Sequence, residues 1–295
     1  MRHSHGLRAA AAAAAGGGGG SDIAVAHNTS PCISVYPWSS GFGTKYANPA
    51  TLPSATGFGV AFSPDGANIA VGHSIGPCIS VYPWSSGFGT KYADPATLPP
   101  NVGRSVAFSP DGANIAVAHS TSPFISVYPW SSGFGTKYAD PATLPPETGR
   151  SVAFSPDGTN IAVAHTIGPC ISVYPWSSGF GTKYADPATL PSATGFGVAF
   201  SPDGTNIAVA HSTSPFISVY PWSSGFGTKY ADPATLPTSP GLGVAFSPDG
   251  ANIAVAHDSS PFISVYPWSS GFGTKYANPA TLPTGNGNGV AFNPL

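Results

Sequence analysis

Six histidines recur along the chain at a constant spacing of 46 residues, and such a ring of equivalent side chains suggests metal binding. They are His27, His73, His119, His165, His211 and His257. Each ends a predicted second strand, so neighbouring copies should lie two strand spacings apart, roughly 10 Å. A zinc ion holds its nitrogen ligands at about 2.1 Å. The spacing therefore predicts a hydrogen-bonded structural histidine in each repeat and no metal site.

The other groups that commonly catalyse reactions are repeated or are explained by packing and turns. Cys32, Cys78 and Cys170 share a repeat position with phenylalanine in the other copies, which indicates apolar packing, and their separate repeats argue against a disulfide. Glu147 is the only glutamate, and Asp157 and its copies lie in Ser-Pro-Asp-Gly turns. Paired carboxylates, phosphate-binding loops and metal-ligand spacings are missing from the sequence. We therefore predict that the chain is not an enzyme and needs no cofactor.

One set of candidate binding residues stands just before the first predicted strand of each repeat and differs between the copies. These rim residues are Phe58, Arg104, Arg150, Phe196, Leu242 and Asn288. Paired arginines beside aromatic rings can hold an anionic or polar ligand. The alternative is neutral variation in loops that tolerate change.

A second set is the tryptophan that precedes a Gly-Phe-Gly turn in every repeat. Its members are Trp38, Trp84, Trp130, Trp176, Trp222 and Trp268. Exposed in a ring, these side chains would bind a repeated ligand with avidity, because tryptophan combines an apolar body with a polar tip. The alternative is that they pack between the repeats.

The elements that position these residues follow from composition. The 295 residues are only 7% charged, against about 25% in ordinary domains, and the formal net charge is −2. This balance argues against a nucleic-acid partner and against a polybasic membrane surface. No apolar run approaches the roughly 18 residues of a membrane span.

Each 46-residue repeat predicts four short antiparallel strands. In residues 152–197 they are expected over 152–155, 160–165, 170–176 and 182–185. The Pro-Asp-Gly between the first two favours a tight hairpin, since proline presets φ and glycine accepts a positive φ. A period of 40–50 residues with several short strands is typical of a propeller with one blade per repeat.

The segment VAFSPDGTNIAVAH followed by ISVY resembles the WD40-type repeat, and the resemblance covers all six copies. It implies a propeller fold and says little about function. Tyr174-Pro175 replaces the Trp-Asp pair of that family, and the family's Gly-His pair is missing. The hydrogen-bonded tetrad of the family is therefore not carried over.

The chain ends predict how the ring closes. We expect an all-β, six-bladed β-propeller over 21–295, with four-stranded antiparallel blades. Its first blade would combine 21–53 with 289–295, by pairing of Val290–Phe292 with Ile23–His27. Residues 1–20, rich in alanine and glycine, read as a flexible or vector-derived tail, with a targeting segment or an ordered docking arm as alternatives.

The sequence favours a non-catalytic binding or interaction scaffold. Most repeat positions are nearly identical, and the differences gather in two loops expected on one face of the ring, around the rim residues. The partner would be a protein or a glycan, with lectin-like recognition of a repeated ligand as the sharpest version. The alternative is a purely structural or self-assembling repeat protein, natural or engineered, without a small-molecule ligand. The sequence leaves the oligomeric state and the compartment open.

Overall fold

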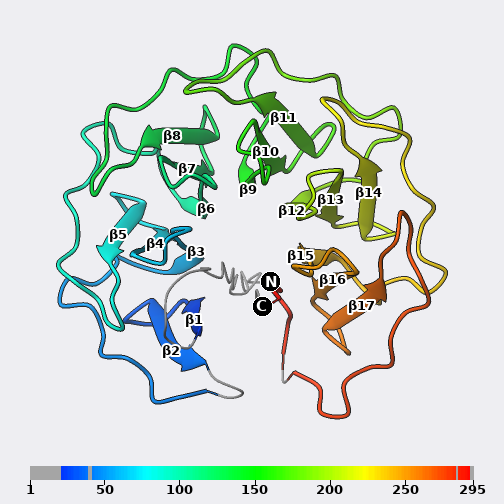
Figure 1. Cartoon of the computed structure of the whole chain (residues 1–295), viewed down its shortest axis with the longest axis horizontal. Coiled ribbons are helices and arrows are strands. Elements are labelled where there is room, and N and C mark those ends of the chain that lie inside the picture. The colour runs from blue at the N-terminus through cyan, green and yellow to red at the C-terminus, as the bar shows by residue number, and fades with distance from the viewer. Residues whose placement is uncertain (1–20, 39–41, 284, 293–295) are drawn as a thin grey trace, which may run out of the picture.

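The computed structural model describes residues 21–38, 42–283 and 285–292, and within them the protein is all-β. Its strands form six antiparallel sheets arranged around a common centre, as Figure 1 shows. We call each sheet a unit. Five units have three strands and the first has two. The predicted tail of residues 1–20 lies outside the described residues.

The units follow one another along the chain. Unit 1 contains β1 (Ser21–Ala26) and β2 (Ile33–Trp38), and unit 2 contains β3 (Gly57–Phe62), β4 (Asn68–His73) and β5 (Ile79–Pro83). Unit 3 contains β6 (Gly103–Phe108), β7 (Asn114–His119) and β8 (Ile125–Pro129), and unit 4 contains β9 (Gly149–Phe154), β10 (Asn160–His165) and β11 (Ile171–Pro175). Unit 5 contains β12 (Gly195–Phe200), β13 (Asn206–His211) and β14 (Ile217–Pro221), and unit 6 contains β15 (Gly241–Phe246), β16 (Asn252–His257) and β17 (Ile263–Pro267).

The predicted hairpin joins the first two strands of each complete unit. In unit 4 the hydroxyl of Ser155 donates to the carboxylate of Asp157, and Gly158 has a φ of 72°. The backbone N–H of Ser155 donates to the carbonyl of Asn160 at 2.9 Å. Glycine accepts this left-handed conformation without a Cβ penalty, so the turn forms where the sequence places it.

The outer edge of each unit differs from the prediction. In unit 4 the N–H of Gly181 donates to the carbonyl of Pro175 at 2.9 Å. The N–H of Tyr184 donates to the carbonyl of Val173, also at 2.9 Å. Pro175 has no N–H with which to return a hydrogen bond, so the ladder cannot become reciprocal there. The predicted fourth strand over 182–185 is therefore wrong, and each complete unit has three strands.

The core lies between the units. Each hydrophobic cluster combines small residues of one unit with the large residues of the next, such as Ala116 and Val127 of unit 3 with Val152, Ile161 and Trp176 of unit 4. The second strands are buried on both faces, as their uninterrupted apolar sequence predicts. Adjacent units therefore stabilise one another, as expected for a repeat protein whose single sheets cannot bury both faces alone.

The C-terminal segment occupies the inner position that follows unit 6 (Figure 1). The N–H of Gly287 donates to the carbonyl of His257 at 2.9 Å, and the N–H of Gly57 makes the equivalent bond to His27 at 3.0 Å. A Cβ placed on Gly243 would lie 2.9 Å from the Cα of Gly289. The segment therefore packs on unit 6 as the inner strand of a further unit would.

The predicted pairing of Val290–Phe292 with Ile23–His27 is wrong in this structure. The strand partner of β1 is β2, and residues 290–292 carry no strand assignment. Elsewhere the first and second strands of a unit are joined by a short turn. In unit 1 the two strands would come from opposite ends of the chain, and bringing those ends together costs conformational entropy. Of the described residues at the C-terminal end, only 290–292 would form hydrogen bonds to offset that cost.

Among the described residues, the boundary between units 6 and 1 lacks the tyrosine–tryptophan contact that joins the other units. Tyr276 of unit 6 is 51% exposed and Phe42 of unit 1 is 66% exposed. In unit 4 the equivalent tyrosine, Tyr184, packs edge-on against Trp222 of unit 5 at 5.1 Å. Trp38 of unit 1, the counterpart of Trp222, is only half-buried. The structure thus describes an open ring of six units.

Candidate binding site at the channel mouth

A β-bulge sets the position of five of the six rim residues. In unit 4, Gly149 pairs with His165 and Ser151 pairs with Ala164, which leaves Arg150 as the extra residue. The same irregularity places Phe58, Arg104, Phe196 and Leu242 in their own inner strands. A bulge re-aims a side chain relative to the regular pleat. Every paired inner strand therefore presents its variable residue in the same unusual way.

The glycine before each rim residue is required by close packing. A Cβ on Gly149 would lie 2.3 Å from the carbonyl oxygen of Phe124. A Cβ on Gly195 would lie 2.3 Å from the carbonyl oxygen of Cys170. Real Cβ atoms do not approach backbone oxygens so closely. The glycine allows the close backbone approach, and the bulge then directs the following side chain to the mouth of the channel.

The rim residues surround a cavity of about 270 Å³ at the centre of the ring. Phe58, Arg104, Phe196, Leu242 and Asn288 line it, and Ser151 lines it beside Arg150. All six rim residues are half-buried. The structure therefore brings together the residues that the sequence placed at the channel mouth.

Each rim arginine lies against a phenylalanine of a neighbouring unit. The guanidinium carbon of Arg104 is 4.9 Å from the ring centroid of Phe58. That of Arg150 is 5.5 Å from the ring centroid of Phe196. Both distances are within the range of a cation–π interaction. The order Phe58, Arg104, Arg150, Phe196 runs through four successive units, so one side of the mouth is positively charged.

Burial disfavours the charged form of both arginines and so lowers their pKa values. Burial first and the nearby charge of Arg150 second together lower the pKa of Arg104 to about 10. Burial also lowers the pKa of Arg150, while the carboxylate of Glu147 acts in the opposite direction. With a pKa of about 10, Arg104 stays protonated at neutral pH. The Nε of Arg104 is buried and has no hydrogen-bond partner among the described residues.

Two serines at the mouth were missed by sequence reasoning. Ser105 and Ser151 follow the two arginines, where the other inner strands have glycine. The hydroxyl oxygen of Ser105 accepts a hydrogen bond from the N–H of Val152 at 3.4 Å. That of Ser151 accepts one from the N–H of Val198 at 3.4 Å. The signal was the co-occurrence of Arg-Ser in two adjacent repeats.

The tryptophans of the aromatic turns are buried rather than displayed. Trp84, Trp130, Trp176, Trp222 and Trp268 are 5–7% exposed, and Trp38 is half-buried at the open boundary. Each buried ring packs edge-on against aromatic neighbours, as Trp176 does with Tyr138 of the preceding unit at 5.1 Å. These side chains hold adjacent units together and offer no ring face for stacking a ligand.

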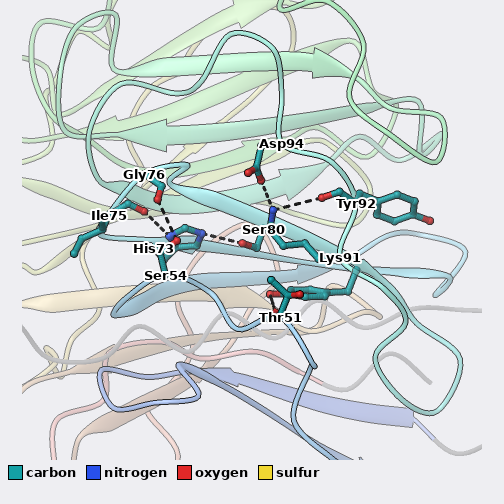
Figure 2. A network of polar contacts seen from close by, with 10 residues as sticks. Thr51, Ser54, His73, Ile75, Gly76, Ser80, Lys91, Tyr92 and Asp94 are labelled. Atoms are coloured by element: carbon teal, nitrogen blue, oxygen red, sulfur yellow. Dashed lines mark hydrogen bonds and ion pairs between the residues drawn. The ribbon is translucent and has the colours of Figure 1, made fainter.

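The repeated histidines are hydrogen-bonded structural groups, as Figure 2 shows for His73. Its Nδ1 is 2.9 Å from the carbonyl oxygen of Ile75, and its Nε2 is 3.0 Å from the hydroxyl of Ser80. A carbonyl only accepts, so Nδ1 donates and the neutral Nε2 accepts from the hydroxyl. Burial lowers the pKa of His119 to about 4, and that of His165 and His211 likewise. These side chains therefore fix the loop after each second strand.

The lysines of the outer segments fold back into ion pairs. Lys91 pairs with Asp94, also drawn in Figure 2, and equivalent pairs form in units 3 to 5. The three cysteines, Cys32, Cys78 and Cys170, are buried and free, and burial raises the pKa of each thiol. Within the described part of the chain, no three His, Cys, Asp or Glu side chains gather as a metal site.

The two variable loops of a unit contact each other. The hydroxyl of Ser54 donates to the carbonyl of Gly76 at 3.1 Å in unit 2. In unit 6 the hydroxyl of Thr238 donates to the carbonyl of Ser260 at 2.9 Å. The variable segments therefore share one face of the ring, and the rim residues follow directly from them.

Comparison with solved structures supports the fold. Hydrazine synthase from Kuenenia stuttgartiensis is similar with a TM-score of 0.65 at 17% identity, over 90% of this chain and 80% of that one. A putative 6-phosphogluconolactonase from Bacteroides uniformis is similar with a TM-score of 0.64 at 16% identity, over 86% of this chain and 80% of that one.

These similarities speak for the fold alone. No protein-family model matches the chain, and no curated protein matches it. Among the described residues, no helix is long and apolar enough to cross a membrane. The chain is an internally symmetric β-protein of six tandem repeats, similar in architecture to propeller-like structures.

Proposed function

We propose that the chain is a non-catalytic binding scaffold of the six-bladed, WD40-like propeller kind, which holds its ligand at the channel mouth. One observation carries the proposal. In every paired inner strand a β-bulge presents a single residue at the mouth, and that residue differs between units while the bulge and the glycine before it repeat. A repeated backbone feature that displays different side chains is what a binding site built on a rigid frame requires.

The rim residues also decide whether lectin-like recognition would use several equivalent sites or one. A multivalent ring of exposed tryptophans has no support, since five of the six side chains are buried and Trp38 is half-buried. A glycan, a peptide end or a small molecule would instead meet one asymmetric mouth, so we propose a single site per chain. The cavity of about 270 Å³ lies just below the usual range of roughly 300–1,000 Å³ for ligand pockets, which favours a small ligand group.

A binding screen with matched variants tests this function. The full chain is screened against a glycan array and a metabolite library by thermal shift. A rim variant carries F58N, R104N, R150N and F196N, because the sixth copy already has Asn288 at this position. The control is Lys229→Gln on the outer side of the ring. Ligands should lose at least about tenfold in affinity with the rim variant and nothing with the control. Equal binding to all three proteins would place the site elsewhere.

The open boundary between units 6 and 1 favours a second candidate, a structural or self-assembling role. Tyr276 and Phe42 expose apolar surface there that is covered at the other boundaries. Light scattering over a range of concentrations separates the two candidates. A constant monomer mass supports the binding scaffold, and a mass that rises with concentration, together with no ligand in the screen, supports assembly.

A further inference from the structure

The Arg-Ser dipeptide breaks the symmetry of the inner ring. It occurs as Arg104-Ser105 and Arg150-Ser151 in two adjacent units. The other four copies carry an apolar residue or asparagine followed by glycine, at 58–59, 196–197, 242–243 and 288–289. Two polar, hydrogen-bonding substitutions that appear together in neighbouring units form a local cluster on one side of the mouth.

The serine hydroxyls have donor capacity left. Each hydroxyl has one proton to donate and two lone pairs to accept with. Ser105 and Ser151 each use one lone pair for the N–H of the next inner strand, at Val152 and Val198. Neither hydroxyl proton has an acceptor among the described residues. Two O–H donors therefore remain available beside the arginines in a cavity wall.

Arg104 also has a hydrogen-bond donor without an acceptor among the described residues. A cation–π contact uses the face of the guanidinium or its charge, whereas its N–H groups point outward in its plane. The Nε of Arg104 is buried without a hydrogen-bond partner among the described residues. Two half-buried positive charges lie in adjacent units, and the carboxylate that acts on Arg150 is that of Glu147. An additional negative charge at the mouth would be stabilised.

We propose that the channel mouth binds a small organic oxyanion, a carboxylate or a phosphate monoester, whose head is held by Arg104, Arg150, Ser105 and Ser151. This inference rests on the proposed binding function and names its ligand class. The N–H groups of a guanidinium form a planar fork that matches the oxygens of a carboxylate or phosphate. The serine hydroxyls add two further O–H donors beside it. The body of the ligand lies among the walls of the cavity, which include Val106.

The cavity limits the size of that body. Its volume of about 270 Å³ corresponds to roughly nine water-sized groups, taking about 30 Å³ for each. Benzoate and phenyl phosphate are of this size and differ only in the anionic head. Benzamide has the shape of benzoate without the charge. These three compounds separate recognition of an oxyanion from recognition of a ring.

Titration calorimetry with these compounds tests the proposal on the full chain. The main variant is R104F/S105G, which gives unit 3 the Phe-Gly found at 58–59 and 196–197, so the scaffold already accepts it. We expect one of the two anions to bind at least about tenfold more tightly than benzamide, and the variant to lose at least about tenfold. Lys229→Gln should bind as the unchanged chain does. The preferred anion identifies the head group.

The single variant Ser105→Gly controls for a folding defect in the double variant. It should lower the affinity for the anion a few-fold and leave the melting temperature unchanged. Equal binding of benzoate, phenyl phosphate and benzamide would overturn the proposal, and so would full affinity in R104F/S105G. If neutral ligands from the screen still bind through the rim, only the oxyanion inference fails. If no compound or glycan binds at all, the proposed function fails with it.

Discussion

The guanidinium of Arg104 leans back over Phe58 of the preceding unit, while that of Arg150 leans forward over Phe196 of the following unit. The two arginines occupy the same repeat position in adjacent units, yet they point to opposite neighbours. Each guanidinium lies over a phenylalanine ring, and the charge of Arg150 acts on Arg104. A repeat with nearly identical copies thus builds one asymmetric site from four variable residues.

Glu147 should weaken anion binding at this site. Its carboxylate acts on Arg150 and would compete with a bound oxyanion. We expect Glu147→Gln to tighten benzoate or phenyl phosphate binding about two- to fivefold at low salt, and less at 0.5 M salt, because the interaction is electrostatic. Calorimetry at the two salt concentrations measures this. Weaker binding in the variant would show that Glu147 helps to hold the ligand.

Gly149 should not tolerate a side chain. Alanine there would place its Cβ 2.3 Å from the carbonyl oxygen of Phe124, so the backbone would have to shift. We expect Gly149→Ala to cost at least about 2 kcal/mol of unfolding free energy, measured by urea denaturation. The control is Gly76→Ala, where a Cβ would meet nothing within 4 Å. Equal stability of the two variants would contradict the close packing that supports the bulge.

Acid should destabilise the protein between pH 7 and pH 5. The buried histidines are neutral when folded, with the pKa of His119, His165 and His211 at about 4, and they take up protons when unfolded. Each contributes stability above its unfolded pKa near 6.5 that is lost as the pH falls toward 4. The loss is on the order of 1–2 kcal/mol per histidine from pH 7 to pH 5.

Urea denaturation as a function of pH measures this effect. The aspartates of the turns also have lowered pKa values, but their contribution is lost only below about pH 4, so it does not overlap with this window. His165→Gln should reduce the slope of stability against pH by about 1 kcal/mol per pH unit near pH 5.5. An unchanged slope would mean that His165 is not held neutral by burial.

The open boundary predicts unequal roles for equivalent tryptophans. Trp130 packs against Tyr92 of the preceding unit at 5.1 Å, whereas Trp38 is half-buried. Trp130→Ala should cost about 3–5 kcal/mol of unfolding free energy, and Trp38→Ala clearly less. Thermal and urea denaturation compare the two. Equal costs would show that the ring is closed in solution, with Trp38 packed against Tyr276.

The sequence was informative where local chemistry decides the structure. The constant spacing of tryptophan predicted six units, and the Pro-Asp-Gly of each repeat predicted the hairpin that the structure contains. The order of the strands then placed Phe58 and Arg104 at the channel mouth, where the cavity is found. Each of these inferences depends only on local sequence: the residues of a turn, the alternation of side chains along a strand, or the length of the repeat.

The sequence was less informative where the outcome depends on distant partners. The bulge at Arg150 depends on the approach of the Phe124 carbonyl, which no local pattern reveals. The fourth strand fails because Pro175 cannot donate, a cost that the apolar pattern conceals. The pairing of the chain ends depends on a balance between loop entropy and a short ladder. Ser105 and Ser151 were overlooked because serine is common in every repeat.

The position of a bound anion is the decisive measurement for a site at the channel mouth. Crystals grown with 4-bromobenzoate and measured at the bromine absorption edge would show where the ligand lies. We expect an anomalous peak inside the channel, with the carboxylate within hydrogen-bonding distance of Arg104 and Arg150 and of the hydroxyls of Ser105 and Ser151. A peak at the outer lysines, or an empty channel at saturating ligand, would mean that the channel mouth does not bind the anion.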